Sequence, residues 1–485
     1  MSASHHSDPT HRTDEQSVQR ESAGRYNKET MDLLQELKTT METSQKNFAF
    51  ACGGSIPIVG PDVEASDTKT GAHLNPVALR WDPRDSSTLA SRCKITFPQE
   101  LKEQQDVLLS ALVADMLPAT FGLGGKDVYD EQYRKALKLE PTQFSISFCP
   151  YQVGIIDAIS KILAPGVGHH TTRAELYKLN VYEGPSGHFK PHVDTPRSTS
   201  QFGSLVVCLP TEHAGGELEV RHNGKRMAFD WSANSGKSNA VQWAAFYSDC
   251  EHEVLPVRSG YRLTLTYNLY AEPAHDLNPA PSVDIQFPLV KYLDEVLNRN
   301  DFMPKGGYLG FYTSHAYPHT SRSFSISALK GIDRVVWQGF QTLGCFVVLH
   351  PVLDVEMEDE YDCLVHVRVV GDELPAATMD RQVEDEQDMS RMLSSWGVDK
   401  VKYDEVEWMN GNTGKHQEMQ LAYMAYGNDA SIAAEYSYCA IIVQVPQVDE
   451  NSGIRAKLPL QLGRDSERGR ALKRQKRYMD FRYAF

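Results

Sequence analysis

The stretch that decides the fold is ELYKLNVYEGPSGHFKPHVDTP, residues 175–196. Apolar and polar side chains alternate through its first half: Tyr177, Leu179 and Val181 against Lys178, Asn180 and Tyr182. This period of two predicts a strand with one face against a helical layer and one polar face lining a barrel lumen. The Gly/Pro turn that follows leads into a second strand, which ends in His192 and Asp194.

The spacing of His192 and Asp194 predicts a metal site. Residues two apart on a strand point to the same face, so the imidazole and the carboxylate can bind the same metal ion. His252, on a later segment, supplies a third donor. Two histidines and one carboxylate with open positions are typical of non-haem iron(II) oxygenases, although zinc uses the same donors.

A second stretch, SDCEHEVLPVRSGYRLTLTYNLY at 248–270, contains His252 and Arg262. We expect two strands here, joined by a turn at Arg258–Gly260. After that turn Arg262 and Thr264 fall on the polar, lumen-facing side of the alternation. An arginine in a closed lumen needs an anion, and a carboxylate accepts its two parallel N–H groups. A structural ion pair is the alternative for Arg262.

These residues resemble the double-stranded β-helix of iron(II)- and 2-oxoglutarate-dependent dioxygenases, in particular the prolyl 4-hydroxylase-like branch. The likeness is strong over about residues 170–275 and weaker back to about Asn47. It implies that His192, Asp194 and His252 are the catalytic iron ligands. It also implies a set of residues that contact the cosubstrate, namely Arg262, Tyr182, Asn180, Thr264 and Lys178. One departure from the family is Cys208, which stands near the place of a second cosubstrate tyrosine.

The resemblance implies Fe2+ as cofactor and 2-oxoglutarate with O2 as cosubstrates, and it leaves open a use of L-ascorbate. The expected reaction is hydroxylation of an unidentified substrate, with a protein prolyl or other side chain as the first choice. A small-metabolite oxygenase is one alternative. A non-catalytic barrel that serves as a binding module is another, although such a module has no need of the triad together with Arg262. A fold alone does not identify the substrate.

Composition argues against several classes of partner. The 485 residues carry a formal net charge of −15, which makes a nucleic-acid partner unlikely on electrostatic grounds. No long apolar run predicts a membrane span, and the start of the chain has no apolar signal segment. Eight cysteines without a CxxC pair indicate a reducing compartment, so we expect a cytoplasmic or nuclear protein that is not secreted. The basic cluster Arg464–Arg477 is either a solvated helix face or a nuclear signal.

The predicted fold class is α+β: a double-stranded β-helix (jelly-roll) barrel flanked by helices, followed by a C-terminal α+β region. We expect a disordered tail and short helix over residues 1–46, an oxygenase domain over 47–275 and a C-terminal domain over 276–485. Helical spacing appears at Glu100–Met116, Asp127–Lys138 and Tyr151–Leu163 before the barrel. Beyond it, Val290–Asn298 and Lys330–Thr342 also have the pattern of helices.

Overall fold

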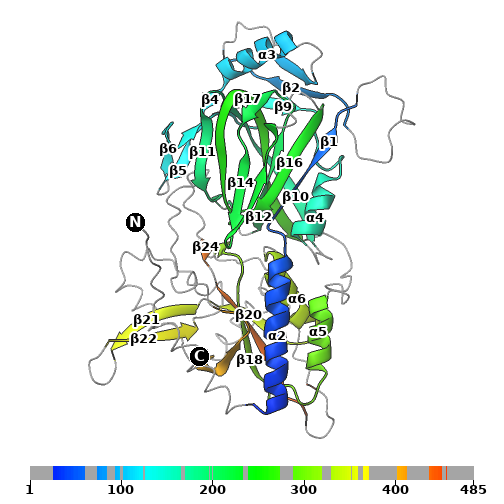
Figure 1. Ribbon diagram of the computed structural model, residues 1–485, viewed down its shortest axis with the longest axis vertical. Coiled ribbons are helices and arrows are strands. Elements are labelled where there is room, and N and C mark those ends of the chain that lie inside the picture. Colours follow the sequence, from blue (N-terminus) through cyan, green and yellow to red (C-terminus); the bar gives the residue numbers. More distant parts are fainter. Residues whose placement is uncertain are drawn as a thin grey trace, which may run out of the picture.

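The computed structural model describes two lobes arranged along one long axis (Figure 1). The described residues are 26–59, 74–84, 93–98, 102–123, 126–164, 170–195, 197–198, 200–232, 239–273, 288–318, 329–350, 352–358, 364–370, 401–411, 436–437, 439–449 and 455. The disordered tail predicted at the start of the chain and the basic cluster Arg464–Arg477 lie outside them.

A twelve-stranded sheet forms the upper lobe. Its main path runs in the order β1 (Ala51–Pro57), β16 (Ala240–Tyr247), β12 (Gln201–Cys208), β17 (Glu251–Pro273), β10 (His170–Glu183), β8 (Leu137–Leu139) and β4 (Leu117–Pro118). Five strands branch from this path: β7 (Arg134–Lys135), β11 (Gly187–His192), β13 (His213–Gly215), β14 (Leu218–His222) and β15 (Lys225–Phe229). All pairings within this sheet are antiparallel.

The strand β17 joins the two parts of this sheet, and here one expectation was wrong. The predicted turn at Arg258–Gly260 does not reverse the chain, because β17 continues through it for 23 residues. Before Gly260 the strand pairs with β11, β13 and β14, and after it with β10 and β12. Gly260 has φ +76°, and a Cβ there would lie 2.2 Å from the Glu212 carbonyl oxygen. A glycine therefore lets the strand continue through a left-handed backbone conformation close to Glu212, where a turn was expected.

Helix α4 (Ile155–Leu163) covers the outer face of the sheet beside β1, β10 and β16. Its buried residues Ile155, Ile159 and Leu163 share a core with the apolar residues of the strands, which confirms that the apolar face meets a helix. The predicted helix at Glu100–Met116 is also present as α3 (Lys102–Asp115). It lies beside β3 (Lys94–Phe97), which forms a small sheet with β2 (Val77–Trp81) and β9 (Phe144–Ile146).

The helix predicted at Asp127–Lys138 is wrong. This segment forms the short strands β6 (Lys126–Val128), β7 and β8, separated by a turn. β6 pairs with β5 (Phe121–Leu123), β7 with β11, and β8 with β10. The polar spacing permits a helix, but pairing with strands far along the chain outweighs local propensity.

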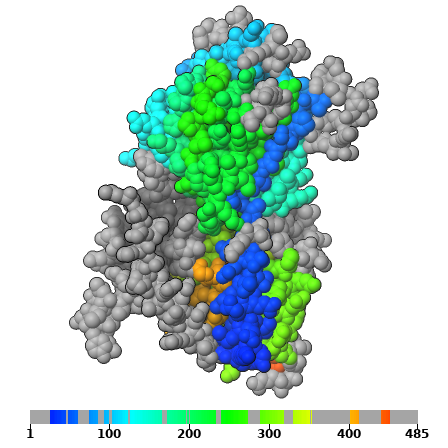
Figure 2. Space-filling view, viewed as in Figure 1, coloured from blue at the N-terminus to red at the C-terminus, as the bar shows by residue number. Residues whose placement is uncertain are grey.

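The lower lobe contains a four-stranded sheet, in the order β20 (Phe346–His350), β25 (Ala440–Val445), β18 (Gly307–Tyr312) and β23 (Val406–Trp408). Its helices are α2 (Lys28–Asn47), α5 (Pro288–Leu297) and α6 (Gly331–Thr342), the last two close to the predicted ranges. Leu34, Leu37 and Met41 of α2 share a core with α5, α6 and the sheet. Figure 2 shows α2 and α5 side by side on this lobe. The N-terminal helix therefore packs on the C-terminal part of the chain.

The described residues form a mixed fold of mostly antiparallel sheets with few helices, in agreement with the α+β expectation. Among pairings of the labelled strands, only β18 with β23 is parallel. The remaining described strands form two-stranded sheets, β19 (Tyr317–Pro318) with β24 (Tyr436–Ser437) and β21 (Val352–Glu358) with β22 (Leu364–Val370). Among the described helices, none combines the length and the apolar character that crossing a membrane requires.

Candidate metal centre and its pocket

The structure brings His192, Asp194 and His252 together. One potential ligand atom of each residue lies within 4.8 Å of the other two, and all three residues are buried. His252 Nε2 is 3.7 Å from Asp194 Oδ1, and the two imidazole centroids are 4.2 Å apart. This set of two nitrogens and one carboxylate on one side of a cavity matches the predicted triad.

Neighbouring strands determine this geometry. His192 at the end of β11 is the direct partner of His252 on β17, so the sheet holds both rings side by side. His192 Nδ1 donates to the Lys190 carbonyl oxygen at 2.9 Å, and His252 Nδ1 donates to the Cys250 carbonyl oxygen at 3.0 Å. These hydrogen bonds leave both Nε2 atoms as acceptors. Such second partners fix the tautomer and the ring orientation of metal-binding histidines.

The donor set also has the protonation states that a metal needs. Burial, followed by the nearby His252, lowers the pKa of His192 well below its usual value, so its imidazole is neutral near pH 7. The Ser204 hydroxyl of β12 donates to Asp194 Oδ2, which leaves Oδ1 facing His252. Neutral imidazole and an oriented carboxylate are the ligand forms that divalent metals bind.

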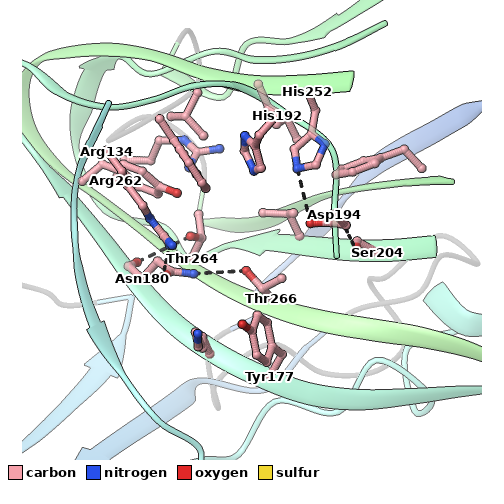
Figure 3. A pocket seen from close by; sticks show the side chains of 17 residues that line it. Arg134, Tyr177, Asn180, His192, Asp194, Ser204, His252, Arg262, Thr264 and Thr266 are labelled. Atoms are coloured by element: carbon pink, nitrogen blue, oxygen red, sulfur yellow. Dashed lines mark hydrogen bonds and ion pairs between the residues drawn. The ribbon is translucent and has the colours of Figure 1, made fainter. Parts of the chain in front are cut away.

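A pocket of about 50 Å³ adjoins the three residues (Figure 3). It is lined by the triad and by residues of β10 and β17, among them Lys178, Asn180, Tyr182, Arg262 and Thr264. The strand register explains this lining, because Tyr182 is the partner of Arg262 and Asn180 the partner of Thr264. All five residues predicted to contact a cosubstrate therefore face one cavity.

Arg262 is the largest fully buried side chain of the described residues, with 1% of its surface exposed. Its Nε and Nη2 atoms have no hydrogen-bond partner, and its guanidinium lies over the rings of Trp231 and Tyr182 at 4.9 and 5.3 Å. Burial lowers the pKa of Arg262, since a buried charge without an anion is unfavourable. An anionic ligand in the pocket would satisfy these donors.

The other predicted contacts differ in their surroundings. Asn180 donates to Thr266 Oγ1 at 3.2 Å and accepts from Arg134 Nη2 at 3.0 Å. Lys178 is buried, with its Nζ 4.3 Å from the ring centre of Tyr177. Cys208 is buried next to Thr264 on the neighbouring strand but does not line the pocket. The structure thus offers no second tyrosine at that place.

The sequence analysis missed several pocket residues, among them Arg134, Phe189 and Ser204. Arg134 of β7 is 4% exposed and lies 4.4 Å over the ring of Phe189. Phe189 in turn stacks on His192, with a distance of 3.5 Å between ring centres. Because the segment of Arg134 was predicted to be a helix, nothing connected it with the metal centre. The Arg-Lys pair at 134–135, followed by alternating apolar residues, was the available signal for a strand.

Comparison with known proteins agrees with this site. Residues 177–270 match the family model of the 2OG-Fe(II) oxygenase superfamily. This stretch contains the triad and Arg262, and it runs from within β10 to within β17. Over residues 177–270, the resemblance to this superfamily that was drawn from the residues is therefore confirmed. The family implies Fe2+ and 2-oxoglutarate. No curated protein sequence matches the chain.

Similar solved structures include several prolyl hydroxylases. A prolyl-4-hydroxylase from Pseudomonas putida has 20% identity and a TM-score of 0.23, covering 35% of this chain and 84% of that chain. A prolyl hydroxylase from Trichoplax adhaerens, in complex with a hypoxia inducible factor peptide fragment, has 14% identity and a TM-score of 0.26. It covers 49% of this chain and 91% of that chain. A viral collagen prolyl hydroxylase from Paramecium Bursaria Chlorella virus-1 has 14% identity and a TM-score of 0.19, and the match covers 28% of this chain and 80% of that chain.

Proposed function

We propose that this chain is an Fe(II)- and 2-oxoglutarate-dependent dioxygenase that hydroxylates its substrate. His192, Asp194 and His252 bind the iron, and Arg262 binds the distal carboxylate of 2-oxoglutarate. A bound ferrous ion would supply the coupling of O2 reduction to the decarboxylation of 2-oxoglutarate, which yields succinate and carbon dioxide. We also propose that the twelve-stranded sheet is the double-stranded β-helix of this family.

The observation that carries the proposal is the buried guanidinium of Arg262 in the same cavity as the triad. A site that binds only zinc for structural purposes needs four closed ligands and no cation beside them. Here the three donors lie on one side of a cavity, and a cation with two unsatisfied N–H groups lies on its wall. This combination suits a metal with open positions and an anionic second ligand.

Each protein group has a separate task in the proposed reaction. The triad orients the metal and leaves coordination positions open to the pocket. Arg262 with Tyr182 recognises the far end of the cosubstrate, and Asn180, Thr264 and Lys178 line the wall beside it. The buried strands around the pocket exclude water, which protects reactive species from side reactions.

The substrate remains the prediction made from the family: a protein prolyl or other side chain, with a small metabolite as alternative. A cytoplasmic or nuclear location also stays a prediction. The domain boundaries at 47 and 276 are likewise proposals. The helix α2, which lies before the first boundary, shares its core with the part of the chain after the second boundary.

The first experiment measures cosubstrate binding in the Mn2+-loaded protein under air, with Mn2+ as a substitute for Fe2+ that does not turn over. Titration calorimetry with 2-oxoglutarate should give one site in the wild type and a loss of about a hundredfold in affinity for Arg262→Met. Arg299→Met, which removes an exposed cation paired with Asp301, is the matched control. Equal affinities in Arg262→Met and wild type would show the role of Arg262 to be wrong.

A second measurement tests the metal ligands. His192→Ala and Asp194→Ala should each lower the bound Mn2+ from about one per chain to background after dialysis, since a three-ligand site loses most of its affinity with one ligand. With Fe2+, O2 and 2-oxoglutarate, the wild type should form succinate and both variants should not. Retention of stoichiometric metal in both variants would contradict the assigned triad.

A further inference from the structure

A second buried guanidinium faces the same pocket, and the proposed function gives it no task. We propose that Arg134 is a carboxylate-binding residue, so that one small dicarboxylate is held between Arg134 and Arg262. The inference rests on the proposed function, which requires 2-oxoglutarate as that dicarboxylate. It assigns the binding of the cosubstrate to two arginines from separate parts of the sheet.

The contacts of Arg134 are all neutral. Its Nη1 donates to the Thr120 carbonyl oxygen at 2.6 Å and its Nη2 donates to Asn180 Oδ1 at 3.0 Å. Its Nε is buried without a hydrogen-bond partner. Within the part of the chain that the structure describes, no carboxylate forms an ion pair with this guanidinium. The contacts hold the side chain in place but leave its charge uncompensated.

A buried cation of this kind is costly unless an anion accompanies it. Arg134 is 4% exposed and Arg262 is 1% exposed, so water cannot solvate either group well. Both line the pocket beside the triad (Figure 3). Two buried guanidiniums facing one cavity therefore predict an occupant with two negative groups.

The positions of the two arginines suit a short diacid. Arg262 is the register partner of Tyr182, whereas Arg134 contacts Asn180, the partner of Thr264. This offset of two residues along β17 corresponds to about 7 Å. Arg134 also lies over Phe189, which stacks on His192, so this arginine belongs to the metal side of the pocket. Arg134 can meet the carboxylate nearer the metal while Arg262 meets the distal one.

The size of the cavity indicates that one molecule meets both cations. Its volume of about 50 Å³ compares with about 10–15 Å³ for one water on the same scale. Such a space is on the scale of one small molecule, and a single dicarboxylate is the simplest occupant that meets both cations. The dicarboxylate itself is therefore the anion that both arginines share.

The experiment compares two ligands in the metal-free, full-length protein: glutarate, with two carboxylates, and pentanoate, with one. Titration calorimetry should show that the wild type prefers glutarate by at least tenfold, since each carboxylate has its own arginine. Arg134→Met should reduce this preference to less than about threefold. Arg173→Met removes an arginine on the exposed side of β10, where it pairs with Glu175 and Glu272, and should keep the full preference.

A second variant covers the case in which Arg134→Met does not fold. Asn180→Asp places a carboxylate at the atom that already accepts from Arg134 Nη2, with almost no change in shape. The internal ion pair should occupy Arg134 and reduce the preference for glutarate to the same level. A folded Arg134→Met or Asn180→Asp variant that keeps the tenfold preference would overturn the inference.

The outcomes separate this inference from the proposed function. If Arg262→Met weakens 2-oxoglutarate binding and Arg134→Met does not, Arg134 has no such role and the proposed function stands. If the wild type binds neither glutarate nor 2-oxoglutarate, with or without Mn2+, both fail. If Arg134→Met and Arg262→Met each lower the preference for glutarate over pentanoate and Arg173→Met does not, the pocket uses two arginines to bind one diacid.

Discussion

The carboxylate of Asp249 and the imidazole of His315 meet across the boundary between the two lobes, with Nδ1 3.1 Å from Oδ2. Lys330 Nζ lies 2.8 Å from the other carboxylate oxygen, and the Ala316 N–H donates to Oδ2 at 3.1 Å. Asp249 lies in the turn between β16 and β17, only three residues before His252. Residues of the lower lobe therefore hold the turn that contains Asp249 by an ion pair and hydrogen bonds. This turn leads directly into the start of β17, where the proposed metal ligand His252 lies.

Asp249→Asn should destabilise the fold strongly. The substitution leaves the buried ammonium of Lys330 without its counter-charge, which typically costs about 3–5 kcal/mol. We expect a large fall in the Tm measured by circular dichroism. Asp301→Asn removes an exposed carboxylate that pairs with Arg299, so its Tm should stay close to that of the wild type. Similar Tm values for the two variants would show that the Asp249 contacts add nothing.

The same carboxylate predicts how stability depends on pH. Burial opposes its ionisation, but the attraction of Lys330, His315 and His222 outweighs burial and holds the pKa of Asp249 well below its usual value. A carboxyl group with a depressed folded-state pKa stabilises the fold above the pKa of the unfolded chain, about 3.9, and loses this effect as pH falls through the folded-state value.

The Tm difference between wild type and Asp249→Asn should therefore be present at about pH 5 and shrink as the pH falls below about 4. Thermal melts at a series of pH values, with Asp301→Asn as the reference, provide the measurement. A difference that grows as the solution becomes more acidic would have the wrong sign for this assignment.

Ser204 should matter through the metal rather than through the fold. Its hydroxyl donates to Asp194 Oδ2 and so orients the carboxylate that faces His252. Loss of such an outer hydrogen bond weakens metal binding about 10–100-fold, so Ser204→Ala should raise the Kd for Mn2+ by that factor. Ser160→Ala removes a hydroxyl that bonds to Ile156 and Thr172 in α4 and β10, and should leave the Kd unchanged. An unchanged Kd in Ser204→Ala would exclude this orienting role.

How far the sequence predicts this molecule depends on whether the information is local. The alternation in residues 179–182 and 261–270 correctly indicates which side chains share a face, because the strand period determines this. It thereby predicts that Arg262, Thr264, Asn180 and Tyr182 line one cavity, as the structure shows. Tyr177, predicted on the apolar face, instead lines the pocket with Lys178, because a register shift interrupts β10 between Leu176 and Lys178. The pairing of β11 with β17, which brings His252 to His192, followed only from the family resemblance.

What could not be predicted depends on distant pairing. Residues 127–138 carry a spacing that also fits a helix, and only contacts with β5, β10 and β11 make them strands. Arg134 was therefore missed. Similarly, Gly260 is a turn signal in isolation, but strands on both sides keep the chain extended. The contact of Asp249 with His315 joins residues 66 apart, and no local pattern marks it.

Gly216 provides the most direct test of how the chain makes room for Arg262. It has φ +79°, and a Cβ at this position would lie 2.8 Å from Arg262 Cδ and 2.8 Å from Val257 Cγ2. Gly224 has nearly the same backbone conformation, φ +73°, but nothing lies within 4 Å of its Cβ position. Alanine at either site therefore meets a similar backbone strain, about 1–2 kcal/mol. Only at Gly216 does the added methyl group also push against the arginine.

Gly216→Ala and Gly224→Ala should lower the Tm by comparable amounts, with the larger fall at Gly216 because Val257 is also crowded. Their affinities for 2-oxoglutarate in the Mn2+-loaded protein should differ much more. A shift of about 1 Å in a guanidinium that binds a carboxylate disrupts its two parallel hydrogen bonds, so we expect at least a tenfold loss for Gly216→Ala and none for Gly224→Ala. Equal affinities in the two variants, measured by calorimetry, would mean that the position of Arg262 does not control binding of the cosubstrate.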